Sequence, residues 1–160
     1  MSEIDYIVQD LIIEKEGKLN VQQLYKTLRA WFNANKYFIL EKEYKDILKT
    51  GSSDLNISWE AIKKADDYTK LKIRVMLTGS EIKKTESNNI VEGNMNIKFE
   101  SLLETDYEDK WEGNPLFKFV RSLFDKFGKE STRSSHENDL KEATYDLYNK
   151  IKSFLSLEKF

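Results

Sequence analysis

The sequence has no cysteine, and it has one proline and one histidine among its 160 residues. The absence of cysteine excludes disulfide bonds, thiolate zinc sites and thiol nucleophiles, so the hydrophobic core must hold the fold by itself. The single histidine, His136, stands among polar residues and has no neighbour that resembles a catalytic triad or a two-histidine metal motif. Acid–base catalysis at neutral pH would need a carboxylate, lysine or tyrosine with a shifted pKa instead. We therefore assign no catalytic residue and no cofactor.

Arginine, strong net charge and long apolar runs are also scarce. Only four of the 26 basic residues are arginine, and the net charge is -2. Because arginine is the preferred residue for bidentate phosphate contacts, nucleic acid is not expected as a partner. No apolar run approaches the ~20 residues of a membrane span, and the first residues show no basic region or cleavage site. The chain is therefore expected to be soluble and cytoplasmic, without a membrane span.

Known phosphate-binding and hydrolase motifs are missing, and the one cluster of carboxylates does not resemble a metal site. Asp106, Glu108, Asp109 and Glu112 lie close together, but they lack the central glycine and alternating ligands of an EF-hand loop. Negative charge before a helix is favoured by the helix dipole, which accounts for this run without a metal. We expect no bound metal.

What the sequence does have is a large apolar fraction arranged with strand and helix periods. Hydrophobic residues make up 39% and aromatic residues 12% of the chain, and no linker divides it. This composition and length predict one α+β domain over residues 1–160. Strict alternation of apolar and polar residues over 55–61, 69–77 and 91–103 predicts three antiparallel strands that are dry on one side.

The first quarter of the chain predicts a strand, a helix and a second strand. Residues 6–16 form the first strand, which Gly17 is expected to end, and Asn20 caps a helix that ends near Asn35. A second strand follows over residues 37–48. On this strand four apolar residues are predicted to share the inward side: Phe38, Leu40, Tyr44 and Leu48.

The last third predicts two helices. Asn114 and Pro115 form a helix start, and apolar residues recur at three- and four-residue steps up to Phe127. A polar break over residues 128–133 should separate this helix from a last one capped by Ser134 or Ser135. The full order is β-α-β-β-β-β-α-α, which predicts a curved antiparallel sheet of about five strands with helices packed on one face.

This order resembles that of the helix-grip domains, the START and polyketide-cyclase-like superfamily. The resemblance covers residues 6–155 and implies a curved sheet that wraps a long helix around an apolar cavity. Separately, the segment DYEDKWEGNPLFKFVRSLFDKF is similar to a segment of small uncharacterised archaeal proteins, and no functional residue follows from that likeness.

Three functions are compatible with these features. The leading hypothesis is a non-catalytic binding domain that holds a hydrophobic small molecule between sheet and helices. Its candidate lining residues are large and lie on predicted inward faces: Trp31, Tyr44, Trp59, Met95, Phe99 and Phe119. The alternative is a protein interaction or homodimer module that docks through Trp111, Phe117 and Phe160. An enzyme based on carboxylates is the third and least favoured hypothesis, because the sequence shows no acid paired with a base.

Overall fold

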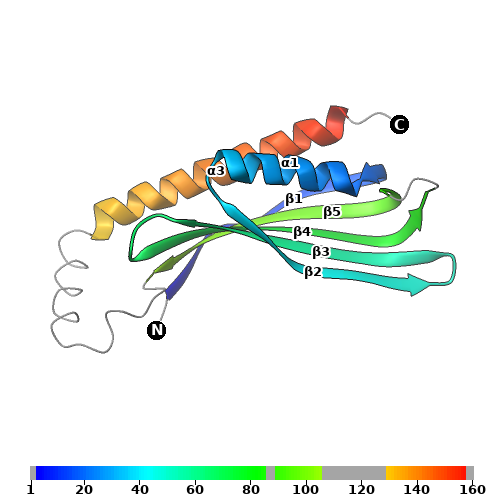
Figure 1. Ribbon diagram of the computed structural model, residues 1–160, viewed down its shortest axis with the longest axis horizontal. Helices are drawn as coiled ribbons and strands as arrows, with labels where there is room; N and C mark the ends of the chain where they lie inside the picture. Colours follow the sequence, from blue (N-terminus) through cyan, green and yellow to red (C-terminus); the bar gives the residue numbers. More distant parts are fainter. Residues whose placement is uncertain (1–2, 86–88, 106–128, 158–160) are drawn as a thin grey trace.

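A five-stranded antiparallel sheet and two helices make up the part of the chain that the computed structural model describes, residues 3–85, 89–105 and 129–157 (Figure 1). The strands lie side by side in the order β1-β5-β4-β3-β2. In chain order the elements are β1 Glu3–Asn20, α1 Val21–Ala34, β2 Phe38–Lys49, β3 Ser52–Lys64, β4 Thr69–Lys84, β5 Ile90–Thr105 and α3 Lys129–Leu157. The α+β class and the antiparallel sheet are confirmed. The predicted helix over residues 115–127 lies outside the described residues.

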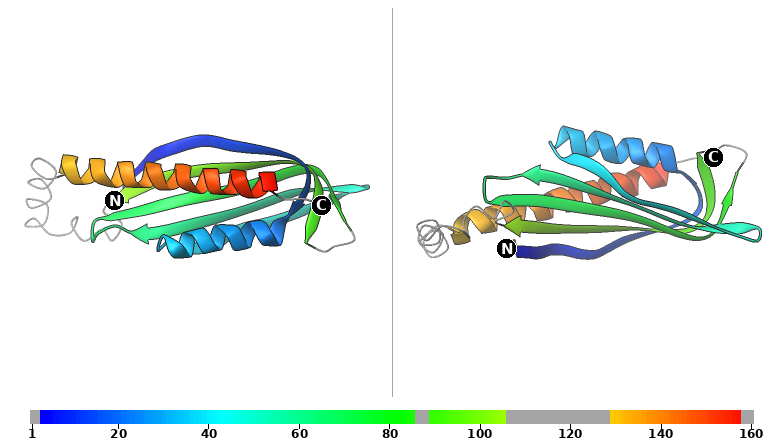
Figure 2. Two further views of the ribbon diagram at one scale, coloured as in Figure 1. Left: turned by 90° about the horizontal axis from the view of Figure 1, so that it is seen from above. Right: turned by 60° about the horizontal axis from the view of Figure 1, so that its bottom comes forward.

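Both helices cover the same face of the sheet, which we call the inner face (Figure 2). The three central strands turn their apolar side chains toward the helices and their polar side chains outward, as the alternation predicts. The inner-face residues of β3, β4 and β5 that are buried are Leu55, Ile57, Trp59, Ala61, Leu71, Ile73, Val75, Leu77, Met95, Ile97, Phe99 and Leu103. Neither of the two described helices is long and apolar enough to cross a membrane.

Gly17 does not end the first strand, which corrects the prediction. β1 continues through Gly17, which has a φ of 108° and pairs with Gly93, and it stops only at Asn20. A glycine inside a strand allows a local bend without breaking the ladder of hydrogen bonds. Asn20 then caps α1 as predicted, because its side-chain oxygen accepts a hydrogen bond of 3.0 Å from the backbone N–H of Gln23.

The predicted inward side of β2 is wrong for Phe38 and Leu40, which face outward, and it is not buried. All four of its members are exposed, from 36% for Leu40 to 77% for Leu48. β2 is the edge strand of the sheet and has one neighbouring strand among the described residues.

A β-bulge also changes which residues of β2 face inward. The register with β3 shifts between Glu41 and Glu43, so the alternation changes phase at Lys42. Residues directly opposite each other share a face. Tyr44 pairs with the inward Ile57 and faces in, whereas Leu40 pairs with the outward Glu60 and faces out.

The last helix begins earlier than predicted. α3 starts at Lys129, so residues 129–133 of the expected polar break and the capping sites at Ser134 and Ser135 lie within the helix. Polar residues such as these carry only a small helix penalty, and packing further along the helix outweighs it. The side of α3 that packs on the core is apolar: Leu140, Leu147, Ile151 and Leu155 are buried, and Ala143 and Phe154 are partly buried.

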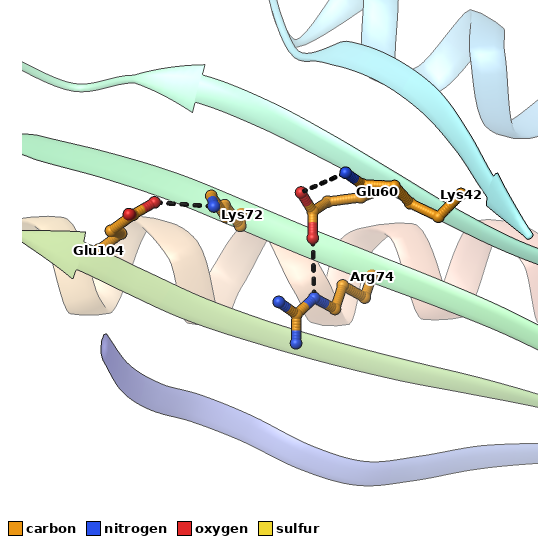
Figure 3. A network of polar contacts seen from close by, with 5 residues as sticks. All are labelled: Lys42, Glu60, Lys72, Arg74 and Glu104. Carbon is orange, nitrogen blue, oxygen red and sulfur yellow. Dashed lines mark hydrogen bonds and ion pairs between the residues drawn. The ribbon is translucent and has the colours of Figure 1, made fainter. Parts of the chain in front are cut away.

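Ion pairs neutralise the basic side chains on the outer face (Figure 3). Lys72 lies 2.7 Å from Glu104, and Arg74 lies 2.9 Å from Glu60, whose other oxygen is 3.9 Å from Lys42. Lys72 therefore retains only 16% side-chain exposure, although the alternation predicts a freely solvated lysine.

Candidate functional site

A groove of about 610 Å³ lies between the first turns of α1 and the inner face of β2 and β3. We call it the α1 groove. The ends of β4 and β5 close it on the side away from β2. Its lining residues are Val21, Gln22, Tyr25, Glu41, Tyr44, Asp46, Ser53, Leu55, Ile57, Trp59, Ile82, Lys84, Thr85, Asn89 and Val91.

The floor of the α1 groove is apolar because β3 lays its inward residues along it. Leu55, Ile57 and Trp59 are spaced two residues apart on β3, so they share one face, and each is at most 4% exposed. Tyr25 of α1 packs against this floor, with its ring centroid 6.1 Å from that of Trp59 and an angle of 31° between the planes. The packing of Tyr25 on Trp59 joins the helix wall to the sheet floor.

The β2 wall is aromatic and acidic because of the bulge. Tyr44 lies opposite Ile57 and Glu41 lies opposite Trp59, so both side chains share the inner face with the floor. Tyr44 is 60% exposed, which leaves most of its ring free for contact at the rim of the groove. Without the bulge, Glu41 and Tyr44 would point to opposite sides of the sheet.

An ion pair forms the polar end of the groove. Lys84 Nζ lies 2.7 Å from Asp46 Oδ2. The hydrogen bond from Lys84 holds the pKa of Asp46 below its usual value, and the neighbouring Ser53 hydroxyl lowers it further. That hydroxyl also lies 3.4 Å from the backbone oxygen of Ile82, which it can reach as a donor. Asp46 Oδ1 is buried and has no hydrogen-bond partner among the described residues.

Hydrogen bonds join α1 to the residue before β5 on the side of the groove away from β2. The backbone N–H of Val21 donates to the Asn89 carbonyl at 2.9 Å, and the Asn89 side chain donates to Gln22 Oε1 at 2.8 Å. These bonds join the first turn of α1 to the β4–β5 connection. The α1 groove is therefore bounded on this side by the β4–β5 connection.

Few titratable side chains line the α1 groove. Its lining holds two carboxylates and one lysine, and that lysine is already paired. Within the described ranges no cluster of three or more histidine, aspartate or glutamate residues could hold a metal. His136 contacts Asp66 at 3.1 Å, and neither residue lines the groove. The acidic run at residues 106–112 lies outside the described residues.

The structure brings two of the six predicted ligand-binding residues into the α1 groove, namely Tyr44 and Trp59. Trp31, Met95 and Phe99 lie in the core, where their exposures are 8%, 2% and 0%. Phe119 and the predicted partner-binding residues Trp111 and Phe117 lie outside the described residues.

Sequence reasoning missed Tyr25, Glu41, Asp46 and Lys84 as lining residues. Tyr25 is readable in hindsight, because it sits at the flank of the apolar stripe of α1 beside Leu24 and Leu28. The three charged residues depend on strand register and on the bulge, which a single sequence does not reveal.

A second hollow, of about 630 Å³, differs in chemistry. Its lining is mostly carboxylate, amide and hydroxyl groups: Glu14, Lys15, Glu16, Ile47, Asp54, Asn56, Thr78, Gly79, Ser80, Asn94, Met95 and Asn96. It has no aromatic side chain and no continuous apolar floor, so the α1 groove is the better candidate for a hydrophobic ligand.

Comparison of the sequence with protein-family models and with curated proteins gave no match.

Proposed function

We propose that this chain is a non-catalytic binding domain that holds a small, largely apolar molecule in the α1 groove. One observation carries the proposal: an apolar floor under an aromatic wall borders about 610 Å³ of open space. Ligand sites in proteins are concave, mostly apolar and about 300 to 1,000 Å³ in size, with a few polar groups that orient the ligand. Asp46 and Lys84 would supply those polar groups. Membership of the helix-grip superfamily and a cytoplasmic location remain predictions.

A titration with a hydrophobic dye or a fatty acid tests this function. Trp59 lies in the floor, so its fluorescence should change in a saturable way as the groove fills. The variant Val21→Phe should lower the affinity, because Val21 lines the groove at the partly exposed start of α1 and a larger side chain would occupy ligand space.

The matched control is Ile47→Phe, which enlarges an exposed side chain of β2 that does not line the α1 groove. If the Val21→Phe variant binds the dye or fatty acid as tightly as the wild type does, binding in the α1 groove is contradicted. Any binding that remains would then be at another site.

A second candidate function is self-association through the outer edge of β2. One observation favours it: β2 has no strand on its outer side among the described residues, and it exposes Phe38, Ile47 and Leu48. Exposed apolar edge strands are templates for pairing with another chain. If two copies pair antiparallel about an axis at Tyr44, Glu43 of each copy faces Lys45 of the other, which is favourable.

Charge reversal tests this alternative. Within one chain Glu43 and Lys45 are 3.1 Å apart on an exposed surface, so single substitutions should leave the monomer folded. The Glu43→Lys variant should remain monomeric at concentrations where the wild type dimerises, and adding Lys45→Glu should restore the dimer. Sedimentation would show this, and a wild type that stays monomeric at all concentrations argues against the alternative.

A further inference from the structure

The α1 groove carries an unbalanced negative charge. Glu41 and Asp46 contribute two carboxylates and Lys84 one ammonium group. Lys84 is held by Asp46 at 2.7 Å, so these two charges offset each other. Glu41 has no ion-pair partner in the part of the chain that the structure describes, and its side chain is exposed. A ligand in the groove would therefore meet one uncompensated carboxylate.

Three aromatic rings line the same volume as that carboxylate. Tyr25 and Trp59 form one packed pair, with ring centroids 6.1 Å apart. Tyr44 pairs with Ile57, two residues before Trp59, so it is the diagonal neighbour of Trp59 on the inner face. Glu41 lies directly opposite Trp59. The faces of tyrosine and tryptophan attract a cation placed within about 6 Å of the ring centre, and this attraction grows when the cation is desolvated.

The rest of the lining suits an apolar tail. Leu55 and Ile57 continue the floor away from Trp59, and Ile82 and Val91 close its far end. None of these four side chains offers a hydrogen bond. A molecule with its charged head near Glu41 could extend its hydrocarbon part along them.

The alternatives fit the groove less well. An anionic head group would need a free cation, but Lys84 is committed to Asp46. A neutral apolar molecule would make no use of the Glu41 carboxylate.

We propose that the α1 groove selects organic cations: amphiphiles whose alkylammonium or quaternary ammonium head lies among Tyr44, Trp59 and Glu41, with an apolar tail along β3. This specificity rests on the proposed function, because it names the ligand class of the same groove.

Three probes with one tail and different heads test the specificity: octyltrimethylammonium, 1-octanol and octanoate. Calorimetric titration of the full chain should show the cation binding at least about tenfold more tightly than the alcohol and the carboxylate. Glu41→Gln should lower the affinity for the cation by about three- to tenfold and leave the affinity for the alcohol unchanged. Tyr44→Leu should likewise reduce the preference for the cation.

Glu43→Gln is the matched control. It removes a carboxylate of the same strand, but Glu43 lies on the outer face opposite Ser58 and does not line the groove. If Glu43→Gln lowers the affinity for the cation as much as Glu41→Gln does, the attraction comes from the general surface charge and the proposal is overturned.

The outcomes separate the specificity from the function. If octanol or octanoate binds at least as tightly as the cation and this binding is lost in the Val21→Phe variant, cation selection is refuted. The groove would still be a binding site. No saturable binding of any of the three probes would count against both.

Discussion

Trp31 Nε1 donates a hydrogen bond of 2.8 Å to Asp146 Oδ2, and this bond links α1 to α3 across the top of the core. The indole also makes an edge-to-face contact with Phe32, with ring centroids 5.4 Å apart. Trp31 is therefore a structural residue that sets the spacing of the two helices. It was predicted to line a ligand site, but here it packs in the core.

Removing the acceptor should cost stability. In the Asp146→Ala variant the indole N–H loses its partner at a site where Trp31 is only 8% exposed. We expect the free energy of unfolding to fall by about 1 to 2 kcal/mol, measured by urea denaturation. Glu142→Ala, on the exposed side of α3, is the control and should change it by less than about 0.5 kcal/mol. A similar loss in both variants would mean that the hydrogen bond contributes nothing specific.

The Trp31→Ala variant should be more severe. It empties a large aromatic site among Phe32, Tyr37 and α3, and such truncations cost about 3 to 5 kcal/mol. A cost below about 1 kcal/mol by chemical denaturation would show that α1 packs differently from this structure.

Tyr37 should make the fold sensitive to alkali. Burial raises the pKa of Tyr37 to about 12, and the negative charge of Asp139 adds to the shift. The unfolded chain loses the Tyr37 proton near pH 10, before the folded chain does, so the stabilising contribution is complete below about pH 10 and disappears as the pH rises toward 12. Tyr37→Phe should flatten the fall in stability over this window.

The measurement is the free energy of unfolding of the wild type and the Tyr37→Phe variant between pH 8 and 11.5. The slopes should agree at pH 8 and diverge above pH 10. As a control, Tyr145→Phe changes an exposed tyrosine on α3 and should follow the wild type. Parallel curves for Tyr37→Phe and the wild type would contradict the burial of the phenol.

Glu60 and Arg74 should behave as a coupled pair. The Glu60 side chain is only 8% exposed on the outer face, and Arg74 at 2.9 Å is its nearest cation. Arg74→Met leaves this carboxylate with the more distant Lys42, so we expect a loss of about 2 to 3 kcal/mol. The double variant Glu60→Gln with Arg74→Met should recover much of that loss. A double-mutant cycle with no coupling energy would show that the pair is merely adjacent.

Gly79 should control the shape of the far end of the groove. A methyl group on Gly79 would lie 2.8 Å from Ile82 Cδ1 and 3.2 Å from Met95 Cγ, and both side chains are buried. Gly79→Ala should therefore push Ile82 toward the groove, lower stability by about 1 to 3 kcal/mol and weaken ligand binding. Ser80→Ala, at the next and exposed position, should leave both properties unchanged.

The sequence predicts the central strands well because one of their faces is dry. Charged residues such as Lys70 and Lys72 alternate with Leu71 and Ile73, and a slip of one residue would bury the charges. β2 gives no such constraint, because nearly all of it is exposed at the sheet edge, and its bulge at Lys42 left no signal in the residue pattern. The prediction that Gly17 ends the first strand was wrong for another reason: glycine marks a turn more often than it marks a bend within a strand.

The candidate site was partly predictable on the same grounds. Trp59 follows from the alternation of β3, and Tyr44 follows from the alternation of β2 beyond the bulge, where the predicted inward side is correct. Glu41 could not be chosen, because alternation without the bulge puts it on the side away from Tyr44. The Asp46–Lys84 pair joins residues on strands that are not neighbours, a relationship that only the folded sheet supplies.

The pairing of the first strand with the fifth has a consequence for the order of folding. β2 to β5 can form from short hairpins, but β1 must wait for residues 90–105, since its pairs run from Glu3 with Thr105 to Asn20 with Ile90. Closing so long a loop is entropically costly and slow. During synthesis β1 and the attached α1 would therefore remain without their sheet until β5 has emerged. The α1 groove would then come into existence only when the amino-terminal segment docks onto a meander that has already formed.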